Sequence, residues 1–224
     1  MIPHGAKPWK ALSWPNRISL LRLLLVGPFI VLLLNQPAWP RARHAALAIF
    51  LVMAFSDMAD GMLARRLNQK SRLGAILDPL ADKTLIVSAV FLLSARSLAP
   101  AGAADLTLPN WVVVAVVGKD LWIVVGCLVI YLVTDRLRVL PTRAGKLCTA
   151  GQLVMVGYAL VAPDAEKLAA GAGFWGVQGA SAAVAALSIA AIISYTRLGL
   201  SFVAAEAKPL DEAAARTDRD DRKH

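Results

Sequence analysis

The sequence predicts an all-α protein, a polytopic bundle of six transmembrane helices, and three observations support this. Of its 224 residues 58% are hydrophobic and 17% are charged, with a mean hydropathy of +0.59, which is too apolar for a soluble domain. The apolar residues gather in six runs, most of them close to the ~20 residues that cross ~30 Å of hydrocarbon. The net charge is +9, and the basic residues lie between these runs, where they orient the chain and attract anionic lipid headgroups. The predicted partner is therefore the lipid bilayer, and no motif points to nucleic acid.

The N-terminal residues 1–17 combine three basic residues with two tryptophans and three prolines, a composition typical of a segment that lies at the membrane surface. The first apolar run, residues 18–34, has the length of a membrane span. No small-residue cleavage site follows it, so it is expected to remain in the membrane as the first helix and not to act as a cleavable signal peptide.

Five further spans are predicted at residues 44–64, 73–95, 110–133, 147–162 and 174–196, of which the fifth is the shortest. Small residues in the sixth span are expected to pack closely against another helix, inside the protein or at the contact of a homodimer: Gly176, Gly179, Ala182 and Ala183. The membrane domain therefore covers residues 18–200. Residues 201–224 are charged and poor in apolar residues, so they are predicted to form a disordered cytoplasmic tail.

The distribution of lysine and arginine predicts the orientation. With the N-terminus in the cytoplasm, 17 basic residues fall on the cytoplasmic side, four fall on the opposite side and three fall within spans. The positive-inside rule therefore places both termini in the cytoplasm. Three tryptophans at span ends are expected to anchor the helices at the interface: Trp39, Trp111 and Trp175.

Four aspartates interrupt the second and third spans. Asp57 and Asp60 are three residues apart on one predicted helix, and Asp78 and Asp82 are four apart on the next, so each pair shares a helix face. The short segment between the spans makes these helices antiparallel neighbours, which brings the pairs to a similar depth near the cytoplasm. Crowded carboxylates repel one another unless cations neutralise them, and Mg²⁺ and Mn²⁺ prefer oxygen ligands and often serve phosphates. The pattern predicts a site for one or two such ions and favours phosphoryl transfer.

Small and basic residues accompany the aspartates. Gly61 and Ala64 leave room beside the helix for a base or a phosphate, and Arg65 can pair with phosphate oxygens. The alternative interpretation is helix packing by the small residues and an arginine that extends to the membrane surface.

The chain resembles the CDP-alcohol phosphatidyltransferases at every position of their signature. The matching residues are Asp57-x-x-Asp60-Gly61-x-x-Ala64-Arg65, eight residues, and then Gly74-x-x-x-Asp78-x-x-x-Asp82. The similarity extends to Pro15-Asn16 with Ser19 and Arg22, and to Gly145-Lys146 with Thr149 and Gln152.

This resemblance implies an enzyme that moves the phosphatidyl group of CDP-diacylglycerol to an acceptor hydroxyl and releases CMP, in a bacterial inner membrane with the active site facing the cytoplasm. By position it implies that Asp57, Asp60 and Asp78 bind metal, two Mg²⁺ or Mn²⁺ ions being expected. Asp82 would be the general base and a further ligand. The implied CDP-lipid-binding residues are Gly61, Ala64, Arg65 and Gly74.

The acceptor is less clearly indicated. A phosphorylated acceptor needs basic partners, for which the candidates are Lys119, Lys146 and Arg197. Lys119 and Asp120 lie within a span, where an unpaired charge costs at least ~2.5 kcal/mol, so they are expected to have partners or a function. The triplet Gly118-Lys119-Asp120 departs both from the Ser-Arg-Glu-like triplet of phosphatidylglycerophosphate synthases and from the Arg-Asp of cardiolipin synthases. Glycerol 3-phosphate is the first choice of acceptor, and phosphatidylglycerol, which would make the protein a cardiolipin synthase, is the second.

A membrane transporter or channel is the alternative from another class, because charged residues inside spans also mark ion pathways. Against it, the aspartates gather near one end of two adjacent helices, and no pair of interrupted spans indicates inverted repeats.

Overall fold

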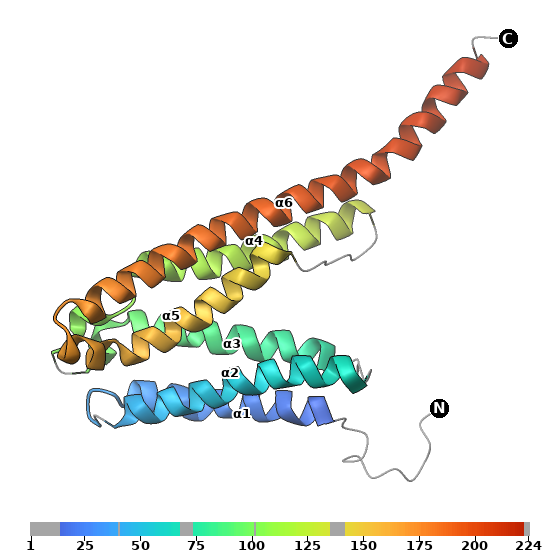
Figure 1. The fold of residues 1–224 in the computed structure, drawn as a ribbon. Helices are drawn as coiled ribbons and strands as arrows, with labels where there is room; N and C mark the ends of the chain where they lie inside the picture. Colours follow the sequence, from blue (N-terminus) through green and yellow to red (C-terminus); the bar gives the residue numbers. More distant parts are fainter. Residues whose placement is uncertain (1–13, 40, 68–73, 101, 135–141, 222–224) are drawn as a thin grey trace, which may run out of the picture. The chain divides into compact units, whose positions relative to one another are not determined.

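The computed structural model describes residues 14–39, 41–67, 74–100, 102–134 and 142–221, which form six α-helices and two short 3₁₀ turns without a β-strand (Figure 1). The elements are α1 (Trp14–Leu34), α2 (Ala42–Leu67), α3 (Gly74–Ser94), η2 (Arg96–Leu98), η3 (Ala104–Leu106), α4 (Asn110–Thr134), α5 (Arg143–Leu168) and α6 (Ala172–Asp221). The all-α prediction is confirmed, and each helix corresponds to one predicted span. The predicted surface segment 1–17 lies largely outside the described residues, and α1 already includes its last four.

Three helices are long and apolar enough to cross a membrane within the part of the chain whose side chains are described: Asn110–Leu132, Arg143–Leu168 and Ala172–Ser201. Helices α1, α2 and α3 contribute shorter apolar stretches, Leu20–Leu34, Ala42–Ser56 and Lys83–Ser94. The protein is therefore a membrane protein. Six crossings, and the orientation of the termini, stay predictions.

Helix α5 is longer than the predicted fifth span. It covers 26 residues, from Arg143 to Leu168, and contains Pro163. The apolar pattern ends before this proline and the charged residues that follow it, but the helix continues through them. Proline lacks the N–H that would pair with a carbonyl one turn earlier, so the ladder is interrupted locally without ending the helix.

Helix α6 continues for 50 residues to Asp221, so residues 201–221 are helical where a disordered tail was predicted, and residues 222–224 lie outside the described residues. Alanine, glutamate, lysine and arginine dominate much of this stretch, and all four have high intrinsic helix propensity. Low hydrophobicity argues against a packed core, but it does not prevent a polar helix.

The chain divides into two compact units. The first unit contains Met1–Val113 and Gln152–Ala182, and the second contains Val114–Gly151 and Ala183–His224. Helices α4, α5 and α6 each contribute to both.

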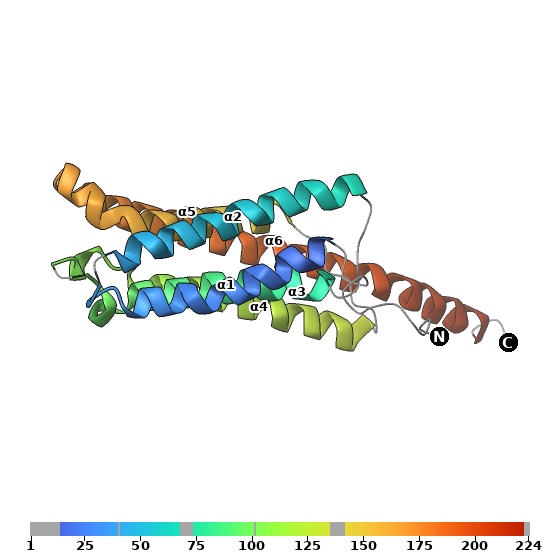
Figure 2. The same ribbon diagram turned by 90° about the horizontal axis from the view of Figure 1, so that it is seen from below.

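In the first unit, α1 packs against both α2 and α3 (Figure 2). Apolar residues at helical spacing form the buried stripes, so that Phe29 of α1 meets Phe50 of α2 with ring centroids 6.2 Å apart. The buried stripes comprise Val26, Phe29 and Leu33 in α1, Ala42, Ala46, Phe50 and Met53 in α2, and Leu85, Ile86, Ala89, Val90 and Leu93 in α3.

Helices α5 and α6 form a tight hairpin in the first unit. Gly171 has a φ of 82°, a conformation that favours glycine, and its N–H donates to Oε1 of Glu166 at 2.7 Å. The N–H of Phe174 donates to the other oxygen of Glu166 at 3.2 Å, so this carboxylate caps the start of α6. The Tyr158 hydroxyl donates to the carbonyl of Ala172 at 2.8 Å.

The small residues of α6 differ in what they contact. A Cβ added to Gly176 would collide with the ring of Tyr158, so this glycine does pack against another helix, inside the protein. A Cβ added to Gly179 would meet nothing within 4 Å, and Ala182 and Ala183 are exposed. These three positions show no helix packing among the described residues, and a homodimer contact stays a prediction.

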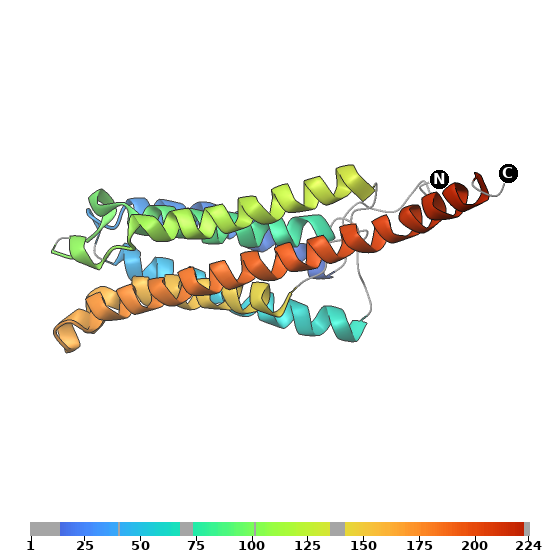
Figure 3. The ribbon, with the colours of Figure 1, turned by 90° about the horizontal axis from the view of Figure 1, so that it is seen from above.

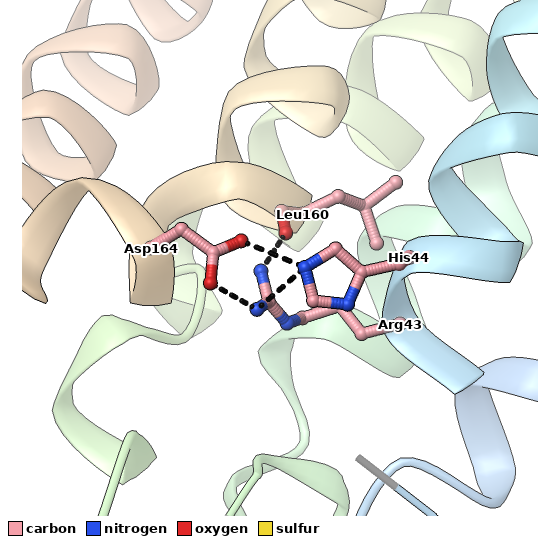
Figure 4. Close-up of polar contacts among 4 residues, drawn as sticks. All are labelled: Arg43, His44, Leu160 and Asp164. Atoms are coloured by element: carbon pink, nitrogen blue, oxygen red, sulfur yellow. Dashed lines mark hydrogen bonds and ion pairs between the residues drawn. The ribbon is translucent and has the colours of Figure 1, made fainter. Parts of the chain in front are cut away.

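A buried arginine joins the start of α2 to the end of α5 (Figure 4). Arg43 Nη1 donates to the carbonyl of Leu160 at 2.5 Å, and Nη2 lies 2.7 Å from Oδ1 of Asp164. The Arg43 side chain is only 7% exposed, while that of Asp164 is 35% exposed. His44, which is more exposed, places Nε2 3.1 Å from the second oxygen of Asp164. Because the buried charge has both a counter-ion and a carbonyl, the link fixes α2 against α5.

In the second unit, α4 and α6 run in the same direction (Figure 3). The indole N–H of Trp122 donates to the hydroxyl of Thr196 at 3.1 Å. Cys148 of α5 lies 3.4 Å from Ser188 of α6, measured from Sγ to Oγ. These contacts fix the alignment of three helices within this unit.

Candidate active site

The eight signature positions lie on two helix ends in the first unit. Asp57 precedes the end of α2 at Leu67 by ten residues, or ~15 Å, and Asp82 follows the start of α3 at Gly74 by eight, or ~12 Å. The linking residues 68–73 lie outside the described part of the structure, as do the side chains of residues 57–67 and 74–82. The helical backbone that the spacing argument requires is present at all eight positions.

The donor set fits a hard divalent cation. On a helical backbone Asp57 and Asp60 share one face, and so do Asp78 and Asp82, which offers four carboxylates from two helices. Carboxylate oxygens are the ligands that Mg²⁺ and Mn²⁺ prefer. Elsewhere, among the side chains that the structure describes, no group of three or more histidines, cysteines or acidic residues could hold a metal ion.

The structure adds a buried cation at the depth of the aspartates. The contact between Phe29 and Phe50 sets the register of the antiparallel helices α1 and α2. Seven residues back along α1 is Arg22, and seven residues forward along α2 is Asp57, so the two lie at the same level. The arginine is 2% exposed. The sequence predicted no role for this arginine beyond the resemblance of its segment to the family. Its position inside the first apolar run could have indicated one, because charged residues within membrane spans usually serve a function.

Lys119, a candidate for acceptor binding, is buried and paired. It lies on α4 in the second unit, is 2% exposed, and places Nζ 2.6 Å from Oδ1 of Asp120. The expectation that these two charges have partners is confirmed.

The three basic candidates all belong to the second unit, and each is near in sequence to a residue in or against one stretch of α6, Tyr195 and Thr196. Trp122 lies about one turn after Lys119 on α4, and its indole N–H donates to the hydroxyl of Thr196. Lys146 follows Gly145, whose Cα faces the Tyr195 ring so closely that an added Cβ would lie 2.8 Å from the phenol oxygen. Arg197 directly follows Thr196, and both it and Lys146 are exposed.

Comparison with known proteins gives a consistent result. The sequence matches the CDP-alcohol phosphatidyltransferase family over residues 12–194. It is 30% identical over 157 residues to the CDP-diacylglycerol–glycerol-3-phosphate 3-phosphatidyltransferase of Bacillus subtilis, covering 66% of this chain and 76% of the relative.

Two proteins of Mycobacterium tuberculosis H37Rv are also similar. A probable phosphatidylglycerophosphate synthase is 37% identical over 144 residues, covering 63% of each chain. A putative cardiolipin synthase is 33% identical over 150 residues, covering 66% of this chain and 64% of the relative. The chain thus spans slightly less than two thirds of these two relatives. Because the family match includes the signature on α2 and α3 and extends over most of the sequence, the chain belongs to the CDP-alcohol phosphatidyltransferase family.

Proposed function

We propose that this protein transfers the phosphatidyl group of CDP-diacylglycerol to an acceptor hydroxyl and releases CMP, with glycerol 3-phosphate as the acceptor and phosphatidylglycerophosphate as the product. The observation that carries the proposal is the complete eight-position signature on the helical ends of α2 and α3, within a family match over residues 12–194. Membership of an enzyme family favours a transferase over a transporter or channel.

The reaction needs one bond to form and one to break. The acceptor oxygen attacks the β-phosphorus of CDP-diacylglycerol, the bond from that phosphorus to the bridging oxygen breaks, and CMP leaves with that oxygen. Asp82 takes the proton of the acceptor hydroxyl as the oxygen becomes bonded to phosphorus. The carboxylate is suited to this role because the hydroxyl becomes strongly acidic only in the transition state.

We propose that Asp57, Asp60 and Asp78, with Asp82 as a further ligand, would hold two Mg²⁺ or Mn²⁺ ions. Bound divalent ions would supply positive charge to the pyrophosphate and to the leaving phosphate. Gly61, Ala64 and Gly74 would leave space for the CDP group beside the two helices, and Arg65 would donate to phosphate oxygens. Arg22, buried at the level of Asp57, would add a fixed positive charge to this group of carboxylates.

The signature ends of α2 and α3 would face the cytoplasm of a bacterial cell, at its inner membrane. The distribution of basic residues supports this orientation, because 17 of 24 would fall on that side. A cytoplasmic site would be reached by a soluble acceptor from water and by CDP-diacylglycerol from the membrane.

Glycerol 3-phosphate is favoured as the acceptor because its phosphate needs basic partners, for which Lys119, Lys146 and Arg197 are the candidates. The relatives named as phosphatidylglycerophosphate synthases point in the same direction. Phosphatidylglycerol is the second candidate, which the cardiolipin synthase relative supports.

The test is CMP release by the detergent-solubilised protein. Every assay contains CDP-diacylglycerol and Mg²⁺, and each adds one acceptor: glycerol 3-phosphate, phosphatidylglycerol, inositol phosphate or serine. The lipid product of each assay is identified. Release of CMP with glycerol 3-phosphate and formation of phosphatidylglycerophosphate is the expected result. CMP release only with phosphatidylglycerol would establish the second acceptor, and no release with any acceptor would refute the transferase proposal.

A further inference from the structure

Gln152 of α5 is a buried amide without a hydrogen-bond partner. Its side chain is 0% exposed, and neither Oε1 nor Nε2 has a partner among the residues that the structure describes. An unpaired polar group inside a protein loses its hydrogen bonds to water without replacement, so native proteins keep very few of them. A glutamine kept in this state has the properties of a side chain that pairs with a ligand.

The contacts between α2 and α5 give the level of this amide. Arg43 of α2 pairs with Asp164 of α5. Phe50 lies seven residues after Arg43, and Gly157 lies seven residues before Asp164. These two residues also face each other, because a Cβ added to Gly157 would touch the Phe50 ring. The antiparallel register is therefore regular. Five residues further along α2 is residue 55, and five residues earlier on α5 is Gln152, so the two lie at the same level. Residue 55 is two residues, or ~3 Å along the helix axis, farther from the C-terminal end of α2 than Asp57 is.

A small pocket in the first unit is lined by residues of both α3 and α5, among them Leu92 and Ala159, so the two helices are neighbours there. Gln152 lies seven residues before Ala159, on the same face of α5. The contacts with α2 therefore give the level of the amide, near Asp57, and the pocket indicates that its face of α5 is the one that turns toward α3.

A second unpartnered polar group lies at this level. Ser181 of α6 is 0% exposed, and its hydroxyl also has no partner within the described part of the chain. Gly176 of α6 packs on Tyr158 of α5, which aligns the two helices. Six residues before Tyr158 is Gln152, and six residues after Gly176 is residue 182, so these two positions lie opposite each other. Ser188 lies seven residues further along α6, and its hydroxyl donates to the carbonyl of Val184 at 2.8 Å. A buried serine in this helix can therefore form a hydrogen bond with its own helix backbone.

We propose that the Gln152 amide determines acceptor specificity by binding the secondary hydroxyl of a glycerol unit, next to the terminal hydroxyl that reacts. This inference rests on the proposed function. A neutral amide offers one donor group and one acceptor oxygen, and a hydroxyl group needs both. An anionic ligand would call for a cation, and an acyl chain would leave the amide unpaired.

The levels fit this role. In this proposal the reacting hydroxyl lies beside Asp82, and the hydroxyl on the neighbouring carbon reaches the amide, which lies two residues, or ~3 Å along the helix axis, from the level of Asp57. Glycerol 3-phosphate and phosphatidylglycerol both carry this secondary hydroxyl, so the inference holds for either acceptor. Gln152 is a positioning residue, and it takes no part in proton transfer.

The experiment removes the hydroxyl and the amide separately and together. The initial rate of CMP release is measured with glycerol 3-phosphate and with 3-hydroxypropyl phosphate, which lacks the secondary hydroxyl. A second arm compares phosphatidylglycerol with phosphatidyl-1,3-propanediol, so that the soluble and the lipid acceptor are distinguished. The variants are Gln152→Met and a matched control, Gln36→Met. Gln36 is also buried, at 4% exposure, but it donates to the carbonyl of Leu33 at 3.1 Å.

Wild-type protein and Gln36→Met should prefer the hydroxylated acceptor by roughly 10- to 100-fold in kcat/KM, because the analogue leaves the amide unpaired. In Gln152→Met the preference should fall to about twofold, mainly through slower use of the hydroxylated acceptor. If Gln152→Met does not fold, Gln152→Asn, which keeps the amide but withdraws it by one methylene, should lower the preference.

Two results would overturn the inference. A wild-type protein that uses both members of a pair equally well does not read the secondary hydroxyl. A preference that survives in both Gln152 variants would mean that buried water or the protein alone satisfies the amide. Absence of CMP release by the wild type with either acceptor would instead refute the proposed function, and the inference with it.

Discussion

The link between Arg43 and Asp164 allows a prediction about which partner matters more. The Arg43 side chain is 7% exposed and that of Asp164 is 35% exposed. Asp164→Ala leaves a buried guanidinium without its counter-ion, whereas Arg43→Met leaves without its counter-ion a carboxylate that water can reach. We therefore expect removal of the acid to destabilise the protein more than removal of the base does.

The magnitudes follow from these environments. Removing one partner of a buried ion pair costs about 3–5 kcal/mol, and Asp164→Ala should lie near the lower value because the carbonyl of Leu160 still accepts from Arg43. Arg43→Met keeps the apolar stem and should cost about 1–2 kcal/mol, mainly through the lost hydrogen bond to the carbonyl of Leu160. The double variant removes the stranded charge, so it should be more stable than Asp164→Ala alone.

Thermal unfolding in detergent measures these differences. At about 2–4 °C per kcal/mol for a chain of this size, Asp164→Ala should lower Tm by about 6–12 °C and Arg43→Met by about 2–8 °C. His44→Ala is the control, because its 56% exposed side chain makes a surface pair worth about 0–1 kcal/mol. Arg43 lies 14 residues, or ~21 Å, from Asp57 along α2, so turnover by folded protein should be unchanged. The reasoning is refuted if Arg43→Met is the more damaging change, or if the double variant is as unstable as Asp164→Ala.

Four further predictions concern the site and the hairpin. Excess chelator should abolish CMP release, and Asp57→Asn should weaken metal dependence and turnover together, whereas a normal metal titration would remove this residue from the ligands. Asp82→Asn should keep CDP-lipid and metal binding but slow turnover by about 10²–10⁴-fold, and a loss of metal affinity as severe as in Asp57→Asn would contradict its role as the base. Lys146→Gln should raise the KM for glycerol 3-phosphate and leave that for CDP-diacylglycerol unchanged, and unchanged values for both would favour phosphatidylglycerol as the acceptor. Gly176→Ala should lower Tm because its Cβ would collide with the facing tyrosine, while Gly179→Ala, with open space around it, should not.

The order and type of the helices could be predicted from the sequence because membrane helices are long, apolar and separated by charged segments. The second span was predicted at residues 44–64 and α2 runs from Ala42 to Leu67. The fifth was underestimated because Pro163 and the nearby charges interrupt the apolar pattern, yet these charges are what bind α5 to α2. The sequence does not reveal that pairing, because the two partners are 121 residues apart.

The site was predictable to the extent that its residues are local in sequence. The four aspartates repeat at helical spacing, so their shared faces could be worked out before the fold was known. Arg22 and Gln152 needed the packing of neighbouring helices, because their place at the depth of the aspartates depends on the contacts of Phe29 with Phe50 and of Gly157 with Phe50. Burial of a polar group without a partner is likewise a property of the folded chain and not of its composition.

The separation of Arg43 from Asp164 also affects how the protein is made. At about 5–20 residues per second, synthesis of the 121 residues between them takes roughly 6–24 s. During that time the start of α2 carries an arginine without its counter-ion, so we expect this end of the nascent helix to remain near water until α5 has emerged. In chains stalled on the ribosome, a cysteine introduced by Ala42→Cys, with Cys127 and Cys148 replaced, should react with a water-soluble thiol reagent before residue 164 is made and become protected afterwards. Early protection would show that α2 can settle in the membrane without α5.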